Sequence, residues 1–168
     1  MLTLLLTGIA VSSFLSACTS LLISFSNAGV MLQIVQWLMG DLNGRDWGHV
    51  HILIIPVLFS ICLFLYYAND LDIFLLGEEQ AQNMGISVQR TRNILLIVAS
   101  LVTGISVALT GAIGFVGLIV PHMIRMIIGP THRYLLLASA LGGATFLIVA
   151  DLISRLVIRP AEIQIGII

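Results

Sequence analysis

Residues 94–113 read ILLIVASLVTGISVALTGAI, a run of twenty residues without a charged side chain. A helix of that length extends for about 30 Å, which is the thickness of the hydrocarbon core of a bilayer. An apolar run that continues over this distance is typical of a transmembrane helix. The stretch therefore predicts that the chain crosses a membrane.

The composition of the whole chain agrees with this prediction. Hydrophobic residues make up 59% of the 168 residues, charged residues make up 9%, and the mean hydropathy is +1.12. Soluble domains carry roughly 25% charged residues, and a soluble fold of this size would expose too much of its apolar surface. The net charge is −1 and no basic run occurs, so nothing indicates a nucleic-acid partner.

Further apolar stretches lie on both sides of the first, with polar segments between most of them. We predict an all-α fold, a polytopic transmembrane helix bundle that forms one domain over residues 1–168. Its spans are expected at residues 2–25, 51–68, 94–113, 115–129 and 134–155. Arg90 and Arg92 precede the third span, and Arg125 and Arg133 flank the end of the fourth, which favours a cytoplasmic side for both places.

Small side chains recur every fourth residue along several of these spans, and such ridges let a neighbouring helix approach closely. Other small residues, with one proline, occupy the boundary between the third and fourth spans, where they favour a helix break or kink. The residues to which we assign packing or breaks are Ser12, Ser16, Ser20, Gly104, Ala108, Gly111, Gly114, Gly117 and Pro121, and Ala138 with Gly142 forms a further small patch.

The polar segment at about residues 70–93 contains the most informative motif, LLGEEQAQNMGI at residues 75–86. Glu78 and Glu79 favour the N-terminus of a short surface helix, where they complement its dipole. Gly85 can supply the left-handed residue that ends such a helix. Ala81 and Met84 lie one turn apart and can face a partner. On local physics alone, an ordinary solvated loop remains open as an alternative.

This motif resembles the cytoplasmic loop of the FecCD-like permeases, the membrane subunits of ABC importers for iron–siderophores, cobalamin and haem. That loop follows a Leu-Gly-Glu…Ala…Leu-Gly pattern. The chain matches it at Leu76, Gly77, Glu78 and Ala81, with Met84 replacing the second leucine ahead of Gly85. Further matches follow in family order at Trp37–Gly40, Gly44, Trp47, Gly111–His122, Arg125, His132, Arg133, Ala150, Asp151, Arg155, Leu156, Glu162 and Gly166.

The resemblance implies a permease-like bundle of the type II ABC importers, located in the bacterial inner membrane and incomplete in this chain. It implies that the loop at Gly77–Gly85 is a coupling helix seated in a cleft of a cytoplasmic ATP-binding subunit. ATP hydrolysis would belong to that partner, so we expect neither an enzyme nor a cofactor. The other implied partners are a periplasmic or surface-tethered substrate-binding protein and a second permease subunit.

The resemblance also implies that Arg155 docks on a carboxylate of the binding protein, a role that suits the planar fork of arginine. The alternative is that Arg155 extends to the membrane interface. We expect iron–siderophore transport first. A cobalamin or haem permease, an ion-coupled secondary transporter and an intramembrane enzyme are alternatives.

Two further groups of polar residues have simpler interpretations. His49 and His51 lie near one boundary and His122 and His132 near another, without a carboxylate cluster, so they predict no metal site. Asp151 precedes Arg155 by one helical turn, and we expect these two side chains to form a salt bridge.

Overall fold

The computed structural model of the chain describes the backbone of residues 2–157 and the side chains of residues 5–156. The regular structure of this part is entirely helical, which confirms the predicted all-α fold. The helices are α1 (Leu2–Ser24), α2 (Ala28–Leu38), α3 (Trp47–Tyr66), α4 (Ala68–Phe74), α5 (Glu78–Asn83), α6 (Val88–Thr110), α7 (Val116–Ile128) and α8 (His132–Val157).

Helices α1, α3, α6 and α8 are long and apolar enough to cross a bilayer. Their apolar stretches have 20 to 25 residues each, whereas α2 and α7 are apolar helices of 11 and 13 residues. The short α7 lies in the fourth predicted span, and α2 was not predicted. By length and composition, the described part of the chain is that of a multi-pass membrane protein.

Two of the long helices begin earlier than the apolar runs that predicted them. Helix α3 begins at Trp47 because the Asp46 side chain caps it, accepting the His49 N–H at 3.2 Å. Helix α6 begins at Val88, in polar sequence, where the Gln89 side chain donates to that of Asn93 at 3.0 Å. An apolar run therefore marks the part of a helix that suits lipid, while caps and polar pairs determine where the helix starts.

The chain divides into two compact units, Met1–Leu38 and Met39–Ile168. The first unit holds α1 and α2. In α1 the hydroxyls of Thr19 and Ser20 donate to the carbonyl oxygens of Leu15 and Ser16, each at 2.9 Å. Such bonds to the preceding turn satisfy a hydroxyl within its own helix, which lipid requires because it offers no partner.

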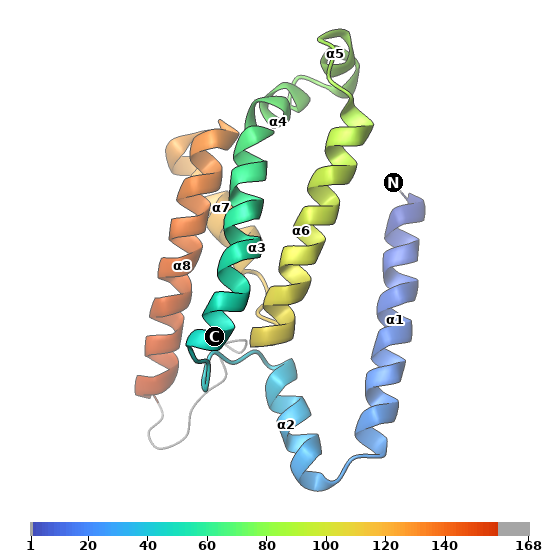
Figure 1. Cartoon of the computed structure of the whole chain (residues 1–168), viewed down its shortest axis with the longest axis vertical. Coiled ribbons are helices and arrows are strands. Elements are labelled where there is room, and N and C mark those ends of the chain that lie inside the picture. Colours follow the sequence, from blue (N-terminus) through green and yellow to red (C-terminus); the bar gives the residue numbers. More distant parts are fainter. Residues whose placement is uncertain (1, 158–168) are drawn as a thin grey trace. The chain divides into compact units, whose positions relative to one another are not determined.

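In the second unit, α3 contacts both α6 and α8, and α7 packs on α8 (Figure 1). The α7–α8 contact depends on Gly142. A Cβ atom at this position would lie 2.6 Å from Cδ1 of Ile124 and 3.2 Å from Cγ1 of Val120. A residue without a side chain therefore lets the two helices approach closely.

The segment before α3 lies against the linker between α6 and α7. Gly40 is buried with φ +74°, and a Cβ atom there would lie 2.7 Å from the carbonyl oxygen of Ala112. The N–H of Asp41 donates to the carbonyl oxygen of Thr110, the last residue of α6, at 2.8 Å. Gly111 follows with φ +74°. Backbone contacts, with glycine at two positions of left-handed φ, thus hold this end of the unit.

Candidate functional site

Helix α5 lies at one end of the second unit, where glycines bound it on both sides (Figure 1). Gly77 precedes it with φ +113° and Gly85 follows it with φ +84°. The N–H of Ile86 donates to the carbonyl oxygen of Ala81 at 3.1 Å, and that of Gly85 donates to Gln82 at 2.9 Å. This pair of bonds is a Schellman motif, so the prediction that a left-handed Gly85 ends a short helix is confirmed.

The side chains around α5 divide into a buried and an exposed set. Ala81 is fully buried, and α5 contacts α4 and α6. Leu75, Leu76 and Met84 are 57%, 59% and 65% exposed. The expectation that Ala81 faces a partner together with Met84 is therefore wrong, because the small Ala81 side chain packs within its own chain. We call residues Leu75–Gly85 the coupling segment, after the role that the resemblance implies for it.

An ion pair joins the coupling segment to α6. The Arg92 guanidinium donates to the Glu78 carboxylate, and both side chains are partly exposed. From the sequence, Glu78 was expected at a helix N-terminus and Arg92 on the cytoplasmic side, but a pair between them was not expected. Their opposite charges, on either side of a short helix, were the available signal.

A second polar contact, not predicted from the sequence, joins α4 to α8. Oδ1 of Asp72 accepts the backbone N–H of His132, the first residue of α8, at 2.8 Å, and lies 2.6 Å from Nδ1 of the same histidine. The Asp72 carboxylate thus caps α8 from a segment 60 residues away in the sequence.

The environment of Asp72 shifts its ionisation. Burial alone raises the pKa of this carboxyl group. The hydrogen bonds from the His132 N–H and ring, together with the His132 charge, lower the pKa by more than burial raises it. The net pKa of Asp72 lies below the usual aspartate value. The carboxylate is therefore the form that the contact with α8 favours.

At the opposite end of α8, Arg155 pairs with Asp151, which confirms the predicted salt bridge. Nε of Arg155 donates to Oδ2 of Asp151 at 2.8 Å, and Nη2 donates to Oδ1 at 3.1 Å. The Arg155 side chain is 45% exposed. The guanidinium is therefore oriented by its own chain while part of it faces outward. Glu162 and Gly166, which matched the family pattern, lie outside the described residues.

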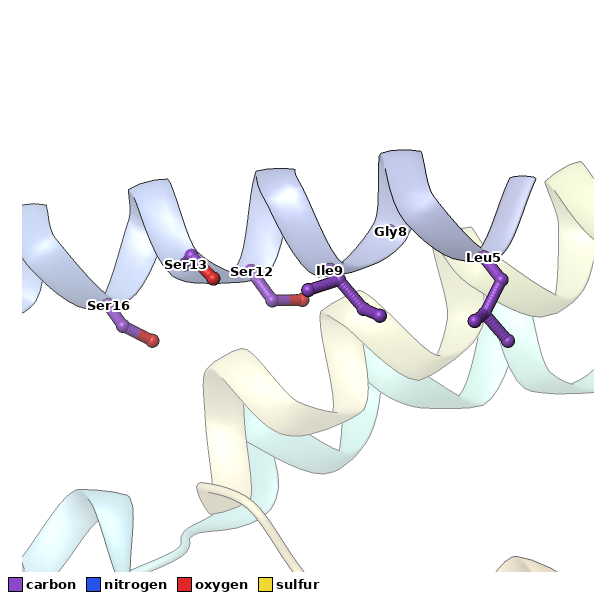
Figure 2. Close-up of a pocket in the computed structure, with 6 residues that line it drawn as sticks. All are labelled: Leu5, Gly8, Ile9, Ser12, Ser13 and Ser16. Carbon is purple, nitrogen blue, oxygen red and sulfur yellow. The ribbon is translucent and has the colours of Figure 1, made fainter. Parts of the chain in front are cut away.

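The small residues assigned to packing are mostly in open positions. Figure 2 shows Gly8, Ser12, Ser13 and Ser16 along α1, together with Leu5 and Ile9. The residues Ser12, Ser16, Ser20, Gly104, Ala108, Gly114 and Gly117 are exposed, whereas Gly111 is buried and Pro121 lies inside α7. A packing role for the exposed members stays a prediction.

The histidines do not gather at one site. His49 pairs with Asp46 at the start of α3, and His132 pairs with Asp72. Among the described residues, no group of three or more His, Cys, Asp or Glu side chains is arranged to hold a metal ion.

Comparison with known proteins gives the same family at every level. A model of the FecCD transport family matches residues 1–168. The chain is 45% identical over 166 residues to the cobalamin import system permease protein BtuC of Halobacterium salinarum, covering 99% of this chain and 44% of that protein. It is 41% identical over 165 residues to the Fe(3+) dicitrate transport system permease protein FecD of Escherichia coli, covering 98% and 52%.

A solved structure described as an inward-facing conformation of a metal-chelate type ABC transporter matches with a TM-score of 0.93 and 33% identity. The match covers 99% of this chain and 54% of that one. The chain spans about half the length of the curated relatives that it matches.

Proposed function

Because the chain belongs to the FecCD transport family, we propose that it is part of the permease subunit of an ATP-driven importer in the bacterial inner membrane. The observation that carries this proposal is the coupling segment. It presents Leu75, Leu76 and Met84 to the surroundings while Ala81 and the pair of Glu78 with Arg92 hold it to its own chain. Exposed apolar side chains on both sides of a well-supported short helix suit a cleft in an ATP-binding subunit.

We propose a metal chelate as the substrate class, with an iron–siderophore as the first ligand to test. Support comes from the relatives named for cobalamin and for Fe(3+) dicitrate, and from the solved structure named for a metal chelate. A cobalamin or haem permease is the alternative within the same family. ATP hydrolysis belongs to the partner subunit, and a second permease subunit completes the membrane part.

We propose that Arg155 docks a substrate-binding protein on the outer side. Asp151 holds the guanidinium in a fixed orientation at the end of α8 away from the coupling segment. A carboxylate of the binding protein can join this pair, because a guanidinium has five donors in a planar arrangement. Replacing Arg155 by Glu is expected to weaken docking, and unchanged affinity at low salt would contradict the role.

The experiment that tests the proposal uses the complete importer in proteoliposomes. Leu76→Glu and Met84→Glu are expected to weaken binding of the ATP-binding subunit by about tenfold or more. Each places a charge where the bound subunit would bury an apolar side chain. Leu42→Glu, in the segment before α3, is the matched control and should leave this binding unchanged. Uptake of a ferric siderophore should fall in the same variants in which binding of the ATP-binding subunit is weakened.

The same preparation separates the proposal from the ion-coupled alternative. Uptake should require ATP and the ATP-binding subunit, and should not follow an imposed ion gradient. Substrate uptake by membranes that contain the permease but no ATPase would refute the proposal and support a secondary transporter.

A further inference from the structure

Helix α8 has a polar pair at each end. His132, its first residue, is bound to Asp72 of α4, and Arg155 in its last turn is bound to Asp151. The helix is continuous over 26 residues, a length of about 39 Å at 1.5 Å per residue. It therefore connects the neighbourhood of the coupling segment with the end that carries Arg155 (Figure 1).

The contact at the first end is partly shielded from solvent. The side chains of His132 and Asp72 are 15% and 32% exposed. One carboxylate oxygen accepts the backbone N–H and lies within hydrogen-bond distance of the ring of the same residue, so the backbone of α8 itself is held. A contact of this kind is less screened by water and salt than an exposed ion pair.

The connection from Asp72 to the coupling segment is hydrogen-bonded at each step. The N–H of Leu75 donates to the carbonyl oxygen of Asp72 at 3.2 Å, and that of Leu76 donates to Ile73 at 3.0 Å. The N–H of Gly77 donates to Phe74 at 3.1 Å. These successive turns leave little freedom between α4 and α5, so a displacement of α5 carries α4 with it.

We propose that Asp72 and His132 are positioning residues that join the coupling segment to α8. A displacement of the coupling segment then moves α8 as one body and reaches the pair of Asp151 with Arg155 at its far end. This inference rests on the proposed function, because it needs a partner that displaces the coupling segment. It goes further in naming the contact and the helix that transmit the displacement.

A purely structural cap would have different consequences from a transmitting contact. Loss of a structural cap lowers the amount of folded protein and reduces ATP hydrolysis and uptake together. Loss of a transmitting contact leaves ATP hydrolysis in place and lowers the substrate moved for each ATP hydrolysed. The decisive quantity is therefore the ratio of uptake to hydrolysis, measured on folded, assembled importer.

The experiment compares Asp72→Ala, His132→Ala and the double variant in the complete importer in proteoliposomes. The control is Asp70→Ala. It removes a carboxylate from the same helix, and in the described structure this carboxylate makes no hydrogen bond. The ratio should fall by about fivefold or more in Asp72→Ala and in the double variant. It should fall less in His132→Ala, because Asp72 still accepts the backbone N–H of residue 132, and stay unchanged in the control. Asp72→Asn should restore most of it, because an amide oxygen still accepts the N–H of residue 132.

A disulfide gives a test that does not depend on removing the contact. Asp72→Cys and His132→Cys are introduced with Cys18→Ser and Cys62→Ser. Under oxidation the covalent link should keep the ratio near that of the unmodified importer. Loss of uptake on oxidation that is regained on reduction would overturn the proposal, because the contact would then have to open.

Movement of α8 can be followed directly with Leu156→Cys, at an exposed position beside Arg155, in the same Cys18→Ser, Cys62→Ser background. Its labelling rate should change when ATP binds, and this change should disappear with Asp72→Ala. If Asp72→Ala leaves either the ATP-dependent change in labelling rate or the ratio of uptake to hydrolysis unaltered, this inference is refuted but the proposed function is not. Failure of the unmodified importer to take up substrate with ATP would instead refute the proposed function.

Discussion

Helices α8 and α6 carry small residues at the same four-residue spacing but use them differently. On α8, Gly142 lies against Val120 and Ile124 of α7, with no room for a Cβ atom. On α6, a Cβ atom at Gly104 would meet no atom within 4 Å. Equal spacing thus indicates that a close approach is possible, but the partner has to come from elsewhere in the structure.

The largest effect is expected at the occupied position. Gly142→Leu should lower the free energy of unfolding in detergent micelles by about 3 kcal/mol, because the new side chain overpacks the α7–α8 contact. Gly143→Leu is the matched control, since a Cβ atom at Gly143 meets no atom within 4 Å. Equal losses in the two variants would show that close packing at Gly142 is not the cause. Ile124→Ala should recover part of the loss.

A smaller loss is expected at Gly40, where the segment before α3 lies against the linker that follows α6. Gly40→Ala should cost about 2 kcal/mol, because alanine is strained at φ +74° and its Cβ atom would meet the Ala112 carbonyl oxygen. Gly44 has φ +67° and open space around it. Gly44→Ala therefore measures the cost of the strained backbone alone. If both variants lose equally by thermal unfolding, the close approach to Ala112 contributes nothing.

The capped end of α8 should lose stability in acid. The pKa of Asp72 is lowered in the folded chain, so its stabilisation is present above the unfolded value of about 3.9 and is lost as the pH falls through the folded value. Asp72→Ala should cost about 1.5 kcal/mol at neutral pH. The measurement is the free energy of unfolding between about pH 7 and pH 2. Asp72→Asn should reduce its loss in acid, whereas Asp70→Asn should leave that loss unchanged.

The smallest effect, of opposite sign, is expected at the open position on α6. Gly104→Leu should stabilise the isolated chain by up to about 1 kcal/mol, because leucine is the better helix former. Circular dichroism during thermal unfolding measures it. A clear destabilisation of the isolated chain would reveal a close neighbour at Gly104. In the complete importer, the same change tests whether another helix occupies this ridge.

These contrasts show which features can be read from the sequence. Apolar runs of about twenty residues located the long helices, because lipid requires that length and composition. The motif around Glu78 and Gly85 predicted a short helix and its end, because capping is local chemistry. Helix α2 was missed, since an apolar helix of eleven residues is too short to indicate a span.

The contacts between distant segments were not predicted. Asp72 lies between Leu71 and Ile73, and a carboxylate in apolar surroundings indicates that a partner exists without indicating which one. His132 is an ordinary residue type at a helix start. The burial of Ala81 was missed for the same reason, because local spacing does not say which face of α5 the chain covers.

The hydroxyls of α1 have a mechanical consequence. Thr19 and Ser20 donate to carbonyl oxygens of their own helix, so these donors are already engaged. A neighbouring helix resting on them meets small side chains and few directional bonds. A helix packed at Thr19 and Ser20 would therefore be held mainly by close contact between the two surfaces.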